Sequence, residues 1–308
     1  MLEKVFDMFK NSCEKWESQS LYELNKKYLM QINKKKASLS KRVKVLLSYL
    51  AQGYLKRFFI RSSSLNANDS FTLKKYDSFF SGRIAIYTSL FGDYDKVCEP
   101  LYVNDNIDYF IFTDQPLDKN SIWKKMDLPN NPDFKKLTSV DKNRYFKILP
   151  HLFFQDYDYS IYVDANVLIV TDLSPIVADC KNKIIAIHKY PLTNCIYDMG
   201  KSIIAGKKAS KKDVREQLAY YRKKGLPKNY GAFECNIIVR AHNNSTCIKI
   251  METWWKDFMT FHSRRDQLSF MFALWANNLQ SEFVFSLGAN VRFNPRFQVL
   301  SHKIKVIR

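Results

Sequence analysis

Short apolar runs alternate with longer helical patterns from residue 83 onward. β-Branched and aromatic runs predict strands at Ile84–Leu90, Tyr109–Thr113, Ile161–Val163, Val167–Val170, Ile184–Ile187 and Ala232–Arg240. Apolar residues at helical spacing predict helices within Val140–Gln155, Ala209–Lys224, Cys247–Met259 and Arg265–Trp275. Strands that alternate with helices are typical of an α/β sheet domain.

The first 75 residues follow a different pattern, helical and outside the sheet-forming region. Between Ser40 and Arg61, apolar residues at helical spacing are interleaved with lysine and arginine. Such a basic amphipathic helix can lie on an anionic membrane surface, or it can pack its apolar stripe on the rest of the protein. We therefore divide the chain into a basic helical N-terminal region, 1–75, and an α/β domain, 76–308.

Composition and charge support a globular protein with one strongly basic end. The 308 residues are 46% hydrophobic and 15% aromatic, enough to bury a substantial core. The formal net charge is +19, and residues 1–75 carry 16 Lys and Arg against 6 Asp and Glu. That block suits an anionic membrane, an acidic partner or nucleic acid. Because no nucleic-acid-binding motif accompanies it, nucleic-acid binding ranks last.

Several classes of protein lack support in the sequence. The six cysteines form no C-x-x-C pair, and no signal peptide or long apolar span is present. We therefore expect a cytoplasmic protein, either free or peripheral on the inner face of the cell membrane. Glycine-rich dinucleotide and P-loop motifs are absent, as are zinc-peptidase and serine-hydrolase motifs. If phosphates bind, side chains and a metal must supply most of the positive charge.

The stretch Asp164-Ala165-Asn166 carries the candidate chemistry. It directly follows a buried strand, where α/β sheets place their ligands, and its side-chain oxygens suit Mg²⁺ or Mn²⁺ together with a diphosphate. The alternative is a tight turn between two strands, since Asp and Asn favour turns. Arg144 and Lys147, three apart on one helical face, could bind phosphate or could belong to a solvated surface.

Eight motifs in order make the chain resemble one known family. They lie at Ile84–Asp95, Asp108–Pro116, Arg144–His151, Tyr159–Ile169, His188–Asp198, Gln217–Pro227, Cys235–Asn243 and Arg264–Phe270. Together they resemble a glycosyltransferase-like family, formerly catalogued as a domain of unknown function, of bacterial surface-polysaccharide gene sets and plant Golgi proteins. The resemblance does not cover the N-terminal 75 residues.

The resemblance implies a GT-A fold, a Rossmann-like sheet that binds a nucleotide-sugar near its strand ends. It places Asp164 and Asn166 at the D-x-D metal motif, where Asn removes one anionic ligand for Mn²⁺ or Mg²⁺. Asp114 would hold the base or ribose, and Thr88 and Tyr94 would belong to the loop near the nucleotide.

The resemblance also implies roles for residues further along the chain. Arg144 and Lys147 would meet the diphosphate. His188, Tyr197 and Asp198 would line the sugar pocket or complete the metal shell, although a satisfied histidine at a strand end is an equal alternative for His188. Asn236, on the strand before the last helices, could contact the acceptor, as could Glu234.

Arg265, Asp266 and Gln267 open the last predicted helix. An Asp-Gln pair here is similar to that of the family-eight glycosyltransferases, where it lies by the donor sugar and acceptor. Asp266 is therefore the candidate for a group near the anomeric carbon or the acceptor hydroxyl. The alternative is a helix N-terminal carboxylate stabilised by the macrodipole.

These inferences predict a membrane-peripheral glycosyltransferase. It would move a sugar from a nucleotide donor, UDP-linked, to a bacterial cell-surface glycan or lipid-linked acceptor. A second hypothesis is a catalytically silent glycan-binding or assembly module that keeps the same fold, motivated by Asn166.

Overall fold

The computed structural model describes residues 82–300, apart from positions 94, 96, 181, 182, 289 and 295. The predicted basic helical region at 1–75 and Tyr94 therefore lie outside the described residues. Within the described part of the chain, no helix has the length and apolar character needed to cross a membrane.

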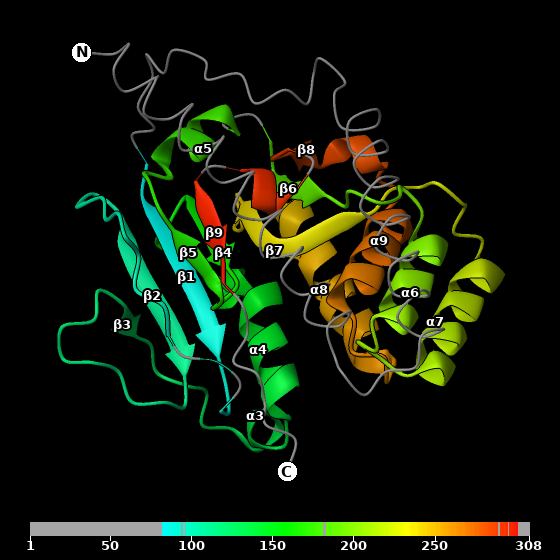
Figure 1. Cartoon of the computed structure of the whole chain (residues 1–308), viewed down its shortest axis with the longest axis horizontal. Coiled ribbons are helices and arrows are strands. Elements are labelled where there is room, and N and C mark those ends of the chain that lie inside the picture. Colours follow the sequence, from blue (N-terminus) through cyan, green and yellow to red (C-terminus); the bar gives the residue numbers. More distant parts are fainter. Residues whose placement is uncertain are drawn as a thin grey trace, which may run out of the picture.

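A seven-stranded sheet forms the centre of the structure, with strand order β3-β2-β1-β4-β7-β6-β8 (Figure 1). The strands of the structure are β1 (Ile84–Leu90), β2 (Asp108–Thr113), β3 (Lys124–Lys125), β4 (Tyr159–Val163), β5 (Val167–Ile169), β6 (Ile185–Lys189), β7 (Phe233–Arg240), β8 (Phe285–Ser286) and β9 (Phe297–Val299). Strands β5 and β9 pair separately as a small antiparallel sheet.

The direction of the strands decides where the site lies. β1 pairs in parallel with both β2 and β4, whereas β7 runs antiparallel to β4 and β6. The carboxyl ends of β1, β2 and β4 therefore share one edge with the amino end of β7. All seven residues of β1 are buried, as expected of a central strand covered on both faces.

Helices cover the sheet unequally. The helices are α3 (Pro132–Lys135), α4 (Ser139–Ile148), α5 (Ser174–Asp179), α6 (Ile196–Ala205), α7 (Lys211–Lys224), α8 (Ser245–Thr260) and α9 (Asp266–Ala276), with 3-10 turns η1 (Pro150–Leu152), η2 (Ser281–Phe283) and η3 (Val291–Phe293). Figure 1 shows α4, α8 and α9 beside the sheet, with α6 and α7 further out.

Two hydrophobic clusters correspond to the two faces of the sheet. The larger cluster packs residues such as Tyr87 against Phe146 of α4, Trp254 of α8 and Phe270 of α9. The smaller cluster packs Ile86 and its neighbours against α5 and β9. The expected α/β architecture is confirmed.

The differences from the predicted elements have local causes. The helix predicted within Val140–Gln155 ends at Ile148, because Pro150 cannot continue it. Helix α6 was not predicted, since Gly200 interrupts a short apolar pattern. His188, predicted to follow a strand, lies inside β6 next to a bulge.

Candidate functional site

Asp164, Ala165 and Asn166 form the turn that joins β4 to β5 at the carboxyl edge of the sheet. The Asp164 N–H donates to Asn236 O at 2.9 Å, and the Val167 N–H donates to Asp164 O at 2.8 Å. The stretch is therefore a tight turn between two strands, as one of its two interpretations predicted. The Asp164 side chain is nevertheless 31% exposed, so its carboxylate can meet other groups at this edge.

Helix α4 brings Arg144 and Lys147 to the same edge. Thr138 caps the helix: its Oγ1 accepts the Asp141 N–H at 3.1 Å. The Tyr87 hydroxyl donates to Lys147 O at 3.2 Å, which joins the last turn of α4 to β1. Because residues three apart share a helix face, both cations point to the same side.

Four of the predicted residues meet there, and we call Arg144, Lys147, Asp164 and Asp266 the ion cluster. Lys147 Nζ lies 3.2 Å from Asp164 Oδ1 and 2.8 Å from Asp266 Oδ2. Arg144 Nε lies 3.0 Å from the same Asp266 oxygen. Only 2% of the Lys147 side chain and 7% of that of Asp266 are exposed. The cluster joins residues from α4, the β4–β5 turn and the start of α9.

Opposite charges decide the ionisation of Asp266 and Arg144. Burial alone would raise the pKa of Asp266, but Arg144 and Lys147 outweigh it and hold that pKa well below its usual range. Burial would likewise lower the pKa of Arg144, but Asp266 and Asp164 raise it. Asp266 is therefore ionised at neutral pH. A carboxylate paired with two cations is a weak general base, so it can hold and orient those cations but cannot readily take a proton.

The loop before α9 is held in place by Arg264. Its guanidinium Nη1 donates to three backbone carbonyls at the end of α8, at 2.9–3.1 Å. Its Nε lies 2.9 Å from Asp141 Oδ1, so α4 and this loop are joined a second time. At the helix start, the Gln267 N–H donates to Asp266 Oδ1 at 3.1 Å. The predicted helix N-terminal position of Asp266 and its contact with cations thus coexist.

Further charges surround the ion cluster. Arg265 precedes α9, Lys208 lies between α6 and α7, and Arg292 lies in η3. Arg265 lowers the pKa of Asp266, and Lys208 interacts electrostatically with Asp266 as well as with Arg265 and Arg292. Glu234 of β7 is buried and accepts the Val291 N–H at 3.2 Å.

Sequence reasoning missed Lys208 and Arg292. In a chain with 49 Lys and Arg, neither stands in a distinctive pattern. Only the packing of α6, η3 and α9 brings Lys208 near both Asp266 and Arg292.

The residues at the predicted metal position do not form a good divalent-cation site. Asp164 shares its Oδ1 with the Lys147 ammonium, and the Asn166 side-chain N–H₂ donates to Leu300 O at 3.1 Å. Among the described residues, no group of three or more His, Cys, Asp or Glu is arranged to hold a metal ion. Mg²⁺ and Mn²⁺ prefer several oxygen ligands with negative charge. One shared carboxylate and one neutral carboxamide do not meet that need.

Of the predicted nucleotide-binding residues, Asp114 directly follows β2, whereas Thr88 lies inside β1. Both Asp114 oxygens accept the Gly92 N–H, each at 3.1 Å, and this joins the loops after the two strands. Gly92 has a φ of +68°, which favours glycine. Thr88 is only 3% exposed within β1 and therefore contributes to the sheet interior. Tyr94 lies outside the described residues.

His188 is fully buried within β6. Its Nε2 accepts from the Asn294 side chain at 3.0 Å, and burial lowers its pKa to about 3. The ring is therefore neutral and hydrogen-bonded through Nε2, whereas its buried Nδ1 has no hydrogen-bond partner among the described residues. The alternative of a satisfied histidine thus holds for one nitrogen only.

Three other predicted residues make their contacts elsewhere. The Tyr197 hydroxyl donates to Leu226 O at 2.6 Å, and Asp198 forms an exposed pair with Lys201 at 2.6 Å. Neither contact joins the ion cluster, because α6 packs along α7. Asn236 lies on β7, where its side chain hydrogen-bonds to Glu234.

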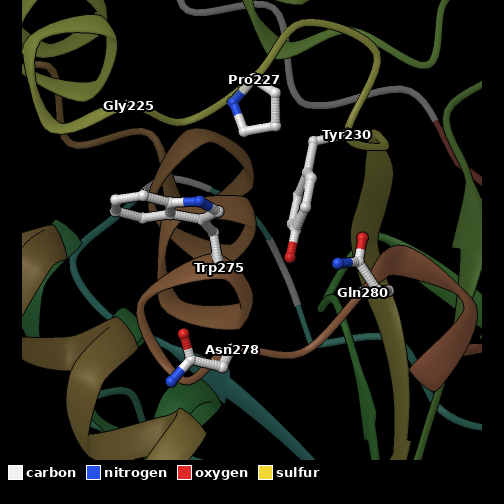
Figure 2. Close-up of a pocket in the computed structure, with 6 residues that line it drawn as sticks. All are labelled: Gly225, Pro227, Tyr230, Trp275, Asn278 and Gln280. Atoms are coloured by element: carbon white, nitrogen blue, oxygen red, sulfur yellow. The ribbon is translucent and has the colours of Figure 1, made fainter.

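A separate pocket of about 340 Å³ lies at the other end of α9 (Figure 2). It is lined by Gly225, Pro227, Tyr230, Trp275, Asn278 and Gln280. Trp275 is nine residues after Asp266, so along the helix the two lie about 13 Å apart. The pocket lining carries no charge. Its aromatic rings and carboxamides suit the apolar faces and hydroxyls of a sugar better than a phosphate.

Solved structures with similar folds include several glycosyltransferases. WbbM, a bifunctional glycosyltransferase in its apo form, is 11% identical with a TM-score of 0.42, covering 68% of this chain and 40% of that one. The galactosyltransferase LgtC with donor and acceptor sugar analogues is 11% identical with a TM-score of 0.39, covering 66% and 72%. The mannosyltransferase Ktr4p of S. cerevisiae with GDP is 11% identical with a TM-score of 0.41, covering 85% and 83%.

The chain thus spans less than half the length of WbbM. No curated protein matches it. A family model described as TOD1/MUCI70, glycosyltransferase-like domain, matches residues 35–302, which is most of the chain. The match extends into the first 75 residues, which the resemblance was not expected to cover. The protein therefore belongs to the TOD1/MUCI70 glycosyltransferase-like domain family, the kind of family that its eight ordered motifs resemble.

Proposed function

We propose that this protein transfers a sugar from a nucleotide-sugar, UDP-linked, to a bacterial cell-surface glycan or a lipid-linked precursor of one. The observation that carries the proposal is the ion cluster. A buried cation, Lys147, and a partly buried one, Arg144, extend from α4 to meet two carboxylates from separate elements at the carboxyl edge of the sheet. Sheets of this class bind their ligands there.

The chemistry requires stabilisation of a leaving diphosphate. The bond between the anomeric carbon and the phosphate oxygen breaks, and its electron pair stays on the nucleoside diphosphate. A new bond forms between the anomeric carbon and an acceptor hydroxyl oxygen, whose proton passes to a base or to water. Cations that are held in place before the reaction stabilise the developing negative charge most effectively. Arg144 and Lys147 are held in this way by Asp266.

The roles of the carboxylates follow from their pairing. Asp266 positions the two cations and offers its remaining acceptor capacity to sugar hydroxyls. Asp164, partly exposed and paired on one oxygen only, faces the donor beside Lys147. A divalent cation would be the other way to stabilise the leaving group, but Asp164 and Asn166 fit such an ion poorly.

A donor-hydrolysis assay tests the proposal. UDP-, GDP-, CMP- and ADP-sugars are incubated with the full chain, with and without Mn²⁺, and nucleotide release is measured. We expect release from one nucleotide class, and a loss of at least about 100-fold in Asp164→Ala. Asp133→Ala, which removes an almost fully exposed carboxylate of α3, serves as the matched control. Unchanged turnover in Asp164→Ala would show that the assigned site is wrong.

The second candidate function is a catalytically silent glycan-binding or assembly module. Asn166 in place of a second acidic residue favours it. Nucleotide-sugar binding without turnover, even with an acceptor glycan present, would support this module over the enzyme.

For location, we propose a cytoplasmic protein bound to the inner face of the cell membrane through its basic N-terminal region. The 16 Lys and Arg within residues 1–75 motivate this. Deleting residues 1–60 should weaken sedimentation with anionic vesicles while sparing donor hydrolysis. Unchanged sedimentation would assign that region to internal packing or to oligomer formation.

A further inference from the structure

Lys208, Arg265 and Arg292 lie close enough to repel one another electrostatically, although Lys208 and Arg292 are exposed at the surface. Partial desolvation and the charges of Arg265 and Arg292 lower the pKa of Lys208, while Glu234 and Asp266 partly offset this. Lys208 lies in the α6–α7 connection, and Arg265 and Asp266 lie at the start of α9. Arg292 lies in η3 and Glu234 in β7. Like charges gathered at one place cost free energy unless an anion relieves the repulsion.

The side chains around the site carry a net positive charge. Five basic side chains (Arg144, Lys147, Lys208, Arg265 and Arg292) interact with three acidic ones (Asp164, Asp266 and Glu234), which leaves two positive charges in excess. Burial raises the pKa of Glu234, so the excess is larger whenever that carboxyl is protonated. A diphosphate carries the complementary charge.

The position that a metal ion would take already holds a cation. The Lys147 ammonium lies between Asp164 and Asp266, within 3.2 Å of both, and is almost fully buried. Asn166 contributes no negative charge, and its side-chain nitrogen is bonded to Leu300 O. A second cation beside Asp164 would be repelled by Lys147 and would find only one protein carboxylate, which Lys147 already shares.

We propose that Lys147, together with Lys208, Arg265 and Arg292, neutralises the leaving diphosphate, so that this protein binds its donor and transfers the sugar without a divalent cation. The inference rests on the proposed glycosyltransferase function. It assigns a supporting electrostatic role to two exposed residues, Lys208 and Arg292.

Binding measured without turnover tests this. UDP and inorganic pyrophosphate are titrated calorimetrically into the full chain, once in EDTA and once in Mg²⁺ or Mn²⁺. We expect affinities within about twofold of each other in the two conditions. Lys208→Met and Arg292→Met should each weaken binding by about threefold at low salt, as expected for the loss of one exposed charge near the anion. Lys211→Met, an exposed lysine three positions after Lys208, should leave affinity unchanged.

Manganese binding provides an independent readout. Electron paramagnetic resonance should detect no stoichiometric Mn²⁺ on the wild-type protein with UDP, whereas Asn166→Asp, which adds a carboxylate, should bind the ion more tightly. Stoichiometric Mn²⁺ on the wild-type UDP complex, or UDP binding that requires a metal, would overturn the inference and leave the proposed function intact. Failure to bind any nucleoside diphosphate or nucleotide-sugar, with or without metal, would overturn both.

Discussion

The ammonium of Lys147 lies 2.8 Å from the carboxylate of Asp266, although one residue ends a helix beside β1 and the other begins the last long helix. Both side chains are almost fully buried. A buried pair of this kind is expensive to break, because the remaining charge is left without a partner in a poorly solvated place. The pair therefore links the stability of the site to its charge.

Replacing Asp266 with Asn separates catalysis from binding. The change removes the carboxylate that orients Arg144 and Lys147, so we expect turnover to fall by about 100-fold or more. Diphosphate affinity should stay the same or increase, since one negative charge is removed. Steady-state kinetics and calorimetry with UDP measure the two effects. Asp133→Asn is the control. Turnover of Asp266→Asn equal to that of wild type would show that Asp266 has no role in catalysis.

Asp114 is expected to affect the nucleoside part of the donor. Its carboxylate holds the Gly92 N–H at the end of β1, so Asp114→Ala frees the loop at which the base or ribose is proposed to bind. UDP affinity should fall about tenfold, whereas pyrophosphate affinity should not change. The control is Asp105→Ala, an exposed carboxylate before β2. Equal losses for both ligands would contradict a nucleoside-specific role.

The uncharged pocket at the end of α9 predicts a separate effect on the acceptor. Trp275→Ala removes its largest aromatic surface, and aromatic contacts of this kind contribute roughly 0.5–1.5 kcal/mol beyond the area they bury. We expect a higher KM for the acceptor glycan and unchanged donor hydrolysis. Trp255→Ala, on α8 outside the pocket, is the comparison. An equal rise in KM in both variants would argue against acceptor binding here.

Gly200 of α6 is required by close packing against α7. A methyl group there would overlap the Leu218 side chain and lie 3.3 Å from Val214 Cγ1. Gly200→Ala should lower the free energy of unfolding by about 1–3 kcal/mol, measured by urea denaturation. Adding Leu218→Val makes room for that methyl, so the double variant should lose less than the sum of the single losses. Additive losses would mean that the helices do not pack this closely.

Asp257 predicts a pH-dependent stability. It is buried in α8 and accepts a hydrogen bond from the Tyr221 hydroxyl, and burial raises its pKa to about 7. The folded protein therefore keeps a proton that the unfolded chain releases above about pH 4. Stability should fall as pH rises from about 4 to about 7, by up to about 1.4 kcal/mol per pH unit, and then level off.

Denaturation of wild type and Asp257→Asn across this range isolates the contribution of that carboxyl. The difference between the two proteins should change with pH, whereas Glu216→Gln, at an exposed position of α7, should parallel wild type. A difference that stays constant from pH 4 to 8 would contradict the raised pKa.

Much of the architecture could be predicted from local patterns. The apolar run Ile84–Leu90 is β1 without change, and the predicted strand at 232–240 and helices at 247–259 and 265–275 agree with β7, α8 and α9 within two residues. Side-chain periodicity and strong breakers act over a few residues, so the sequence reports them directly. The helix predicted within Val140–Gln155 ends at Ile148, before Pro150. Helix α6, in which Gly200 interrupts the apolar pattern, was not predicted.

The sequence by itself determined the α/β order of elements, the family resemblance and the candidate status of Arg144, Lys147, Asp164 and Asp266. Only the tertiary structure decided that these four side chains meet, that Lys208 lies near Asp266 and Arg292, and that Tyr197 and Asp198 turn to other partners. The physical reason is the distance along the chain over which each kind of interaction acts. Helix and strand formation depends on neighbours in the chain, whereas a charge interacts with whatever the packed core places within a few ångströms of it.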